Sequence, residues 1–273
     1  MLVLLCVGGT VISALVSFIL MNLFQLDLFS LTLALYPLLF VLVIPFVFIR
    51  SKLNYQKQIG RGIPVVRSKP SSFGSLQPLL FFPLLLLLTL FFNVVIEPVT
   101  MWLTMPDFIK ELFGAVGNQG WISFFSLVIM APLLEEWLCR GVALDAMLRR
   151  GYSPATAILW SAIMFGVIHL NPWQAIPAFL AGMLFGWIYW RTKSLLSVIF
   201  MHAITNGASL AVTLAFPNLP DEVTSLDILG PSLYGWFFAA SLLITLSLLY
   251  LLHRSLPSRE KYGKDDSTPP TIN

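Results

Sequence analysis

Charged side chains are scarce in this sequence. Asp, Glu, Lys and Arg make up 11% of its 273 residues, whereas hydrophobic residues make up 58%. A soluble domain carries roughly 25% charged residues, which it needs to cover its surface. Together with a mean hydropathy of +0.85, this composition excludes an ordinary soluble domain and predicts a polytopic membrane protein.

Several other features are missing. The chain has only two cysteines, Cys6 and Cys139, and both lie in apolar runs. This pattern predicts neither a disulfide framework nor a metal site built from paired cysteines. No GxSxG motif of a serine nucleophile and no HExxH motif of a zinc protease is present. There is no glycine-rich phosphate loop and no internal repeat. The lack of a repeat argues against transporters built from two matching halves.

Apolar runs of about 20 residues, the length that spans a bilayer as a helix, recur along the chain. They predict an all-α bundle of about eight transmembrane helices with a polar cavity inside the membrane. The first run follows no basic residue and is long for a signal peptide, so we expect it in the mature protein. The predicted spans are about 2–23, 28–49, 78–102, 121–147, 154–170, 174–190, 194–216 and 232–252.

The spans divide the chain into three predicted regions. Residues 1–120 hold N-terminal helices and a basic loop at 50–77 that contains no acid. Residues 121–253 form a transmembrane core that carries the candidate site residues. Residues 254–273 are polar and contain proline, which predicts a disordered tail.

Basic residues predict the orientation of the bundle. Lys and Arg cluster in 50–77, 149–150, 191–193 and 254–264, and eight alternating spans place all four clusters on one side. Because cytoplasmic loops are enriched in Lys and Arg, we expect both termini to be cytoplasmic. The short tails and the absence of organelle signals favour a bacterial plasma membrane, with an ER-type membrane as the alternative. Nothing in the chain predicts a nucleic-acid partner.

A few polar side chains lie inside the predicted spans. An ionisable group at the bilayer centre costs about 2.5–3.5 kcal/mol on insertion scales, and such groups usually face the bundle interior. They are Glu135, Glu136 and Arg140 in the fourth span, His169 in the fifth, and His202 and Asn206 in the seventh. Counting along helices with a rise of about 1.5 Å per residue places Glu136, His169 and His202 in the middle portion of the bilayer.

Spacing within the helices adds detail. Glu136 and Arg140 are four residues apart and share a helix face. Glu135 is turned by about 100° from Glu136, so we expect the two carboxylates to have different partners. A buried Glu–Arg pair alone is more often structural, and a lone histidine often only packs and forms hydrogen bonds. Two carboxylates, two histidines and an amide on three helices instead favour a catalytic or binding site.

Two kinds of hydrolysis fit this set. In one, a glutamate takes a proton from water with the help of a histidine, and the second histidine and Asn206 stabilise the oxyanion. In the other, His169, His202 and Glu135 bind zinc with an open position for water. A non-enzymatic immunity or transport protein is the third alternative, since intramembrane carboxylates and histidines also occur in proton relays.

Three motifs carry a family resemblance. EEWLCR (Glu135, Glu136, Arg140) matches EExxxR, FGVIH (Phe165, His169) matches FxxxH, and HAITN (His202, Asn206) matches HxxxN. Their order within 120–210 resembles the CPBP family of intramembrane proteases, also called the Abi or CAAX-protease family, which includes Rce1-like members.

The resemblance implies an endopeptidase that acts on peptide or protein substrates in the membrane, some of them prenylated. It implies Glu135 as the main catalytic carboxylate, assisted by His169, with His202 and Asn206 stabilising the oxyanion. Glu136, Arg140 and Phe165 have supporting positions. Family members were first regarded as metalloproteases, but a metal-free glutamate mechanism is implied for the Rce1-like type. We therefore expect no cofactor, with zinc as the alternative.

Overall fold

The computed structural model describes residues 1–61, 70–103, 105–107, 110, 120–216 and 224–257. These residues form helices and short connections, with no strand among them. Most of the predicted tail and part of the predicted basic loop lie outside the described residues. The helices are α1 (Leu2–Phe24), α2 (Leu28–Ala34), η1 (Tyr36–Phe40), α3 (Val43–Gly60), α4 (Pro78–Thr100), α6 (Trp121–Ser123), η2 (Phe124–Met130), α7 (Ala131–Glu136), η3 (Trp137–Leu144), α8 (Asp145–Arg149), α9 (Pro154–Val167), α10 (Pro172–Thr192), α11 (Leu195–Ala215) and α12 (Ser225–Ser255).

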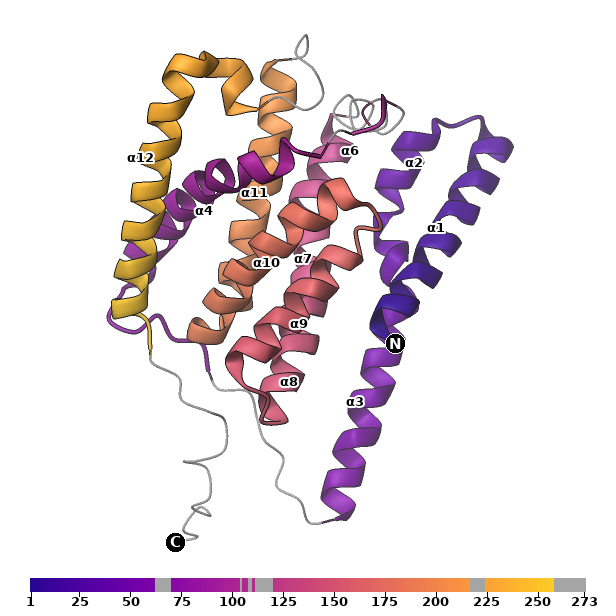
Figure 1. The fold of residues 1–273 in the computed structure, drawn as a ribbon. Coiled ribbons are helices and arrows are strands. Elements are labelled where there is room, and N and C mark those ends of the chain that lie inside the picture. The colour runs from indigo at the N-terminus through magenta and orange to yellow at the C-terminus, as the bar shows by residue number, and fades with distance from the viewer. Residues whose placement is uncertain (62–69, 104, 108–109, 111–119, 217–223, 258–273) are drawn as a thin grey trace, which may run out of the picture.

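Long apolar helices dominate the bundle (Figure 1). Within the described residues, six helical stretches are long and apolar enough to cross a membrane. This confirms the predicted all-α polytopic membrane fold. The six stretches are Leu2–Phe24, Tyr36–Gly60, Pro78–Thr100, Trp121–Arg149, Leu195–Ala215 and Ser225–Ser255.

The predicted number of eight spans is not confirmed. The two remaining predicted spans, 154–170 and 174–190, correspond to α9 and α10, which are outside the set of six. The 14 residues of α9 extend only about 21 Å at 1.5 Å per residue, less than the hydrocarbon thickness of about 30 Å. Helix α10 has 21 residues, so the shortfall in length applies to α9 alone, and apolar composition could not show that α9 stops short.

Helices α9 and α10 run antiparallel to each other and pack closely. A Cβ added at Gly182 would lie 3.1 Å from the Cα of Ala162, and one added at Gly186 would lie 3.0 Å from a methyl group of Ile158. The two glycines therefore allow the backbones to approach, as expected for small residues one turn apart. Because the hairpin starts and ends at the same end of the bundle, the predicted side of the basic clusters does not depend on whether it crosses.

Basic residues from several helix ends meet at one end of the bundle. Asp145 accepts from Lys193 at 3.1 Å and pairs with Arg149 at 3.3 Å. Arg191 donates to the carbonyl oxygens of His253 and other residues at the end of α12. These contacts connect the ends of α8, α10 and α12, which lie together in Figure 1. The end that they form is called the basic end below.

The helices α1, α2, η1 and α3 form a separate arm beside the core (Figure 1). The arm joins the rest of the bundle through a cluster of buried side chains in which Phe40 and Val43 pack against Leu138 of η3. Within the arm, α1 approaches η1 at Gly9, where an added Cβ would overlap the carbonyl oxygen of Leu39. Gly9 therefore sets how closely η1 is held.

Gly9→Ala is expected to lower the thermal midpoint of the protein in detergent, because the added methyl group has no space against the η1 backbone. Overpacking of this kind costs about 1–3 kcal/mol. Gly60→Ala is the matched control, since no atom lies within 4 Å of a Cβ added there. Equal midpoints for the two variants would show that α1 is not packed on η1 in this way.

Candidate active site

The adjacent carboxylates of α7 have different partners. Glu136 accepts hydrogen bonds from Arg140 Nη1 at 2.8 Å and from His202 Nδ1 at 3.0 Å. Glu135 accepts a hydrogen bond from the hydroxyl of Tyr36 and lies near His169. The prediction of separate partners is therefore confirmed, and so is the predicted pairing of one carboxylate with Arg140.

Arg140 is completely buried, which requires nearly all of its donors to have partners. Its Nη2 atom donates to the carbonyl oxygen of Gly182 at 3.1 Å. Its guanidinium carbon lies 4.4 Å from the ring centre of Phe165 and 5.6 Å from that of Phe185, distances at which aromatic faces attract cations. Arg140 thus joins α10 to the helix that carries both carboxylates, and its guanidinium group packs on the ring of Phe165.

His202 is held by three groups. The ring centres of Phe165 and Phe185 lie 5.3 and 6.0 Å from the centre of the imidazole ring. The Nδ1 atom of His202 faces the carboxylate of Glu136. Since a carboxylate accepts hydrogen bonds, Nδ1 carries the proton in this arrangement. The other ring nitrogen, Nε2, is left for a further partner.

His169 lies in the turn after α9 rather than inside a span. Its Nδ1 atom is 2.7 Å from the carbonyl oxygen of Phe165, which assigns the proton to Nδ1 and leaves the lone pair on Nε2. The turn is fixed by Leu170, whose φ is +58°, and by Asn171. The Asn171 side chain caps α10 at Gln174 and also donates to the carbonyl oxygen of His169 at 2.9 Å.

Glu135 and His169 are separated by a distance that one water molecule can bridge. Glu135 Oε2 and His169 Nε2 are 3.9 Å apart, too far for a direct hydrogen bond. Oε2 is buried and has no hydrogen-bond partner among the described residues. A water molecule can contact both atoms at ordinary hydrogen-bond distances, so the arrangement can hold a water between an acceptor oxygen and an acceptor nitrogen.

Two wide π-helical turns flank α7, and side chains from other helices bind their carbonyl groups. Asn206 donates through Nδ2 to the carbonyl oxygen of Leu127 in η2 at 2.8 Å. Ser161 donates to the carbonyl oxygen of Cys139 in η3 at 2.8 Å. π-turns are frequent at functional sites. An amide group has two N–H donors, so the bond to Leu127 leaves one N–H of Asn206 for another acceptor.

Tyr36 is the residue that sequence reasoning missed. It comes from η1, within residues 1–120, and reaches Glu135 across 99 positions of the chain. The sequence does contain a signal for it, because YP lies in the middle of an apolar run and a phenol inside a membrane bundle needs a hydrogen-bond partner. That signal cannot identify the partner. The candidate site therefore also draws on a residue of the N-terminal arm, outside the predicted core at 121–253.

No group of three or more His, Cys, Asp or Glu side chains in the described part of the chain is arranged to hold a metal ion. The predicted zinc ligands divide between two clusters. His169 lies next to Glu135, whereas the Nδ1 atom of His202 faces Glu136. In this structure His169, His202 and Glu135 are therefore not arranged to bind one zinc ion together.

Arg140→Met is expected to destabilise the protein by about 3–5 kcal/mol, because it leaves the Glu136 carboxylate buried without its cation. Replacing both members, as Arg140→Met with Glu136→Leu, removes the unpaired charge and should recover much of the loss. Thermal midpoints of the three proteins in detergent measure both effects. A double variant less stable than Arg140→Met would contradict the pairing.

Comparison with known families matches residues 117–208 to the family described as Type II CAAX prenyl endopeptidase Rce1-like. Comparisons with curated proteins and with solved structures give no significant match. The matched segment contains Glu135, Glu136, Arg140, His169, His202 and Asn206. It supports, in general terms, a membrane endopeptidase. The resemblance predicted from the three motifs is thus confirmed for residues 117–208, about a third of the chain, which are similar to the Rce1-like CAAX endopeptidases.

Proposed function

We propose that this membrane protein is an intramembrane endopeptidase that cleaves peptide bonds with a water molecule held between Glu135 and His169. The observation that carries the proposal is the 3.9 Å separation of Glu135 Oε2 and His169 Nε2, with Oε2 otherwise unpartnered among the described residues. The Rce1-like match of the surrounding segment supports the same reaction class.

The reaction follows from the positions of the acceptors. Glu135 Oε2 takes a proton from the water while His169 Nε2 orients it through the other hydrogen, and the water oxygen attacks the peptide carbonyl carbon. The tetrahedral intermediate then breaks at its C–N bond. Glu135 returns the proton to the leaving nitrogen, so that one water is consumed and an amine and a carboxyl product are released.

His202 and Asn206 are one turn apart on α11 and are proposed to stabilise the oxyanion. The remaining N–H of Asn206 donates to it, and so does Nε2–H of His202 when the ring is protonated. Glu136 is then a positioning residue, since it is completely buried and acts through the His202 ring. Arg140 in turn fixes Glu136.

Tyr36 is proposed to position the catalytic carboxylate. Its hydroxyl donates to Oε1 of Glu135, so the carboxylate plane is held while Oε2 faces His169. A carboxylate with two free oxygens would present either one to the water, in several orientations. A fixed orientation favours the reactive geometry.

We propose that the mechanism uses no metal ion, and the arrangement of the described residues supports this. The division of the predicted zinc ligands between two clusters gives no three-ligand site, and the amide of Asn206 suits an oxyanion better than zinc. No step in the mechanism above requires a metal ion.

The proposed substrate class follows the family resemblance, whereas the proposed orientation follows the positions of the basic residues. We propose substrates that are membrane-embedded or delivered to the membrane, including prenylated CAAX-type proteins, and a bacterial plasma membrane with both termini cytoplasmic. The meeting of Arg149, Arg191 and Lys193 at one end of the bundle supports this orientation, because basic residues gather on the cytoplasmic side.

Glu135→Gln and His169→Ala are each expected to lower the rate of peptide cleavage by at least about 100-fold, since each removes a group that handles the water. The assay uses purified protein in detergent and a panel of prenylated and unprenylated peptides. Asp107→Asn, an exposed acid outside the site, is the control and should cleave like wild type. A zinc chelator is expected to leave cleavage intact.

Two results would contradict this mechanism. Undiminished cleavage by Glu135→Gln would exclude the carboxylate as the base, and cleavage lost to the chelator and restored by zinc would indicate a metalloprotease. If no peptide is cleaved while Glu135→Gln keeps an immunity function in cells, the protein acts by binding and the proposed proteolysis is wrong.

Tyr36→Phe is expected to lower kcat by about tenfold or more and to change KM little, because a hydrogen bond to a charged group contributes about 1.5–3 kcal/mol. Tyr55→Phe, at an exposed position of α3, is the matched control. Wild-type kcat in Tyr36→Phe would mean that the hydroxyl does not position Glu135.

A further inference from the structure

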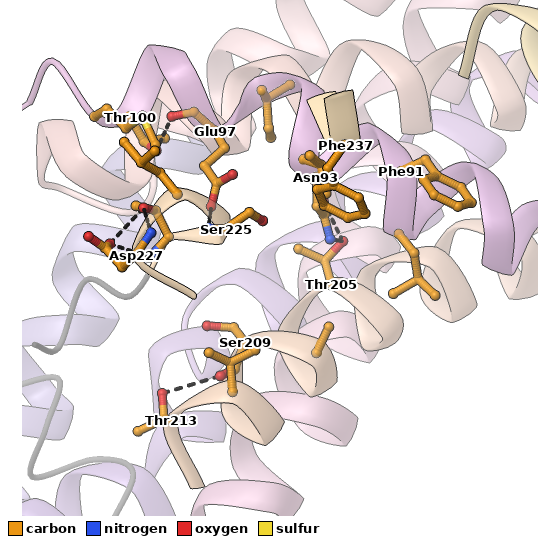
Figure 2. A pocket seen from close by; sticks show the side chains of 18 of the residues that line it. Phe91, Asn93, Glu97, Thr100, Thr205, Ser209, Thr213, Ser225, Asp227 and Phe237 are labelled. Carbon is orange, nitrogen blue, oxygen red and sulfur yellow. Dashed lines mark hydrogen bonds between the residues drawn. The ribbon is translucent and has the colours of Figure 1, made fainter. Parts of the chain in front are cut away.

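A cavity lined by none of the candidate active-site residues lies between α4, α11 and the first turns of α12 (Figure 2). Its volume is about 960 Å³, at the upper end of the roughly 300–1,000 Å³ that is usual for ligand sites. Protein interiors are close-packed, so a space of this size is normally filled. The mechanism proposed above makes no use of it.

The cavity changes in polarity along its length. Leu87, Leu90 and Phe91 line it where α4 is apolar, whereas Glu97 and Thr100 line it near the end of α4. Further polar side chains come from α11 and from the start of α12, and no Lys or Arg is among the described residues that line the cavity. The cavity therefore has an apolar part and a polar part with acidic character. The polar residues outside α4 are Thr205, Ser209, Thr213, Thr224, Ser225 and Asp227.

The two parts correspond to different depths in a bilayer. The chain just before α4 contacts the end of α12 at the basic end, where Ser75 N donates to the carbonyl oxygen of Ser255. At 1.5 Å per residue from Pro78, Leu87 lies about 13 Å and Glu97 at most about 28 Å from the start of α4. Glu97, near the far end of α4, contacts Ser225 at the start of α12, which is the end of α12 away from the basic end, so the cavity lies in the half of the bundle opposite the basic end. This is the depth range of one lipid leaflet.

Glu97 is the acid that can bind a ligand. Oε1 accepts from the backbone N–H of Ser225 at 2.5 Å, but Oε2 is buried without a hydrogen-bond partner among the described residues. Figure 2 shows this side chain extending from α4 toward Ser225. Asp227, by contrast, is occupied by the capping of α12, where it accepts from the backbone and the hydroxyl of Thr224.

A buried carboxylate oxygen requires a donor, and a cationic donor satisfies it best. Lipid chains offer no donor, whereas the ammonium group of an aminophospholipid offers three N–H bonds at the level of the headgroups. The surrounding hydroxyl groups of Thr100 and Ser225 supply further acceptors. An anionic headgroup would instead meet two acids, and no base, among the described residues that line the cavity.

We propose that this cavity binds one lipid of the leaflet opposite the basic end. The primary ammonium group of its headgroup binds Glu97, and an acyl chain lies along the apolar wall formed by α4 and α11. Phosphatidylethanolamine has this chemistry. The inference concerns a site separate from Glu135 and His169, so it does not depend on the proposed proteolysis.

The test measures binding of three lipids to the full-length protein in detergent by native mass spectrometry. Phosphatidylethanolamine and phosphatidylglycerol share the phosphate and differ in the ammonium group, whereas phosphatidylcholine has a cation without N–H donors. Wild type should bind phosphatidylethanolamine at least about tenfold more tightly than either of the others, because charge-assisted hydrogen bonds are the strong ones.

The variants locate the site. Glu97→Gln should lose this preference, and Asp107→Asn, a matched loss of an exposed acid, should keep it. Ala208→Phe, which fills the cavity from α11, should lower binding of all three lipids. It provides an independent test of the site if Glu97→Gln does not fold. Equal affinity of wild type for the three lipids, an undiminished preference in Glu97→Gln, or undiminished lipid binding by Ala208→Phe would overturn the proposal.

Discussion

The buried contact of Glu136 with Arg140 and His202 is the interaction on which the rest of the site depends. Three helices meet there, since Glu136 and Arg140 belong to the long helix at 121–149, Arg140 also donates to α10, and His202 comes from α11. A charge buried in this way is stable only with its partners in place. The pair thereby sets how the three helices are oriented, and with them the neighbouring carboxylate of Glu135.

Around this contact, each group of the proposed chemistry is held by a second group. Tyr36 holds Glu135, the carbonyl oxygen of Phe165 holds His169, and Leu127 holds Asn206. Much of the support comes from outside the residues that carry the chemistry, including an N-terminal arm that lies beyond the segment similar to the Rce1-like family. A family-sized fragment without the arm would therefore lack a partner of Glu135.

Local spacing explains what could be predicted from the sequence. Glu136 and Arg140 contact each other because residues four apart on a helix share a face, and the Phe165–His169 contact has the same origin. Tyr36 could not be assigned, because its partner is 99 positions away and no local pattern encodes that distance. The short α9 and the π-turns also escaped prediction, since a hydropathy pattern reports neither where a helix stops within the membrane nor its number of residues per turn.

The central claim is that Glu135 activates a water molecule rather than attacking the peptide itself. Single-turnover cleavage in ¹⁸O-labelled water tests it most directly, with mass spectrometry of the product and of the protein. The account predicts one ¹⁸O atom in the new C-terminal carboxyl group of the product and none in the side chain of Glu135. Label in the Glu135 carboxyl group after one turnover would contradict it, because that oxygen enters only through an acyl intermediate on the glutamate.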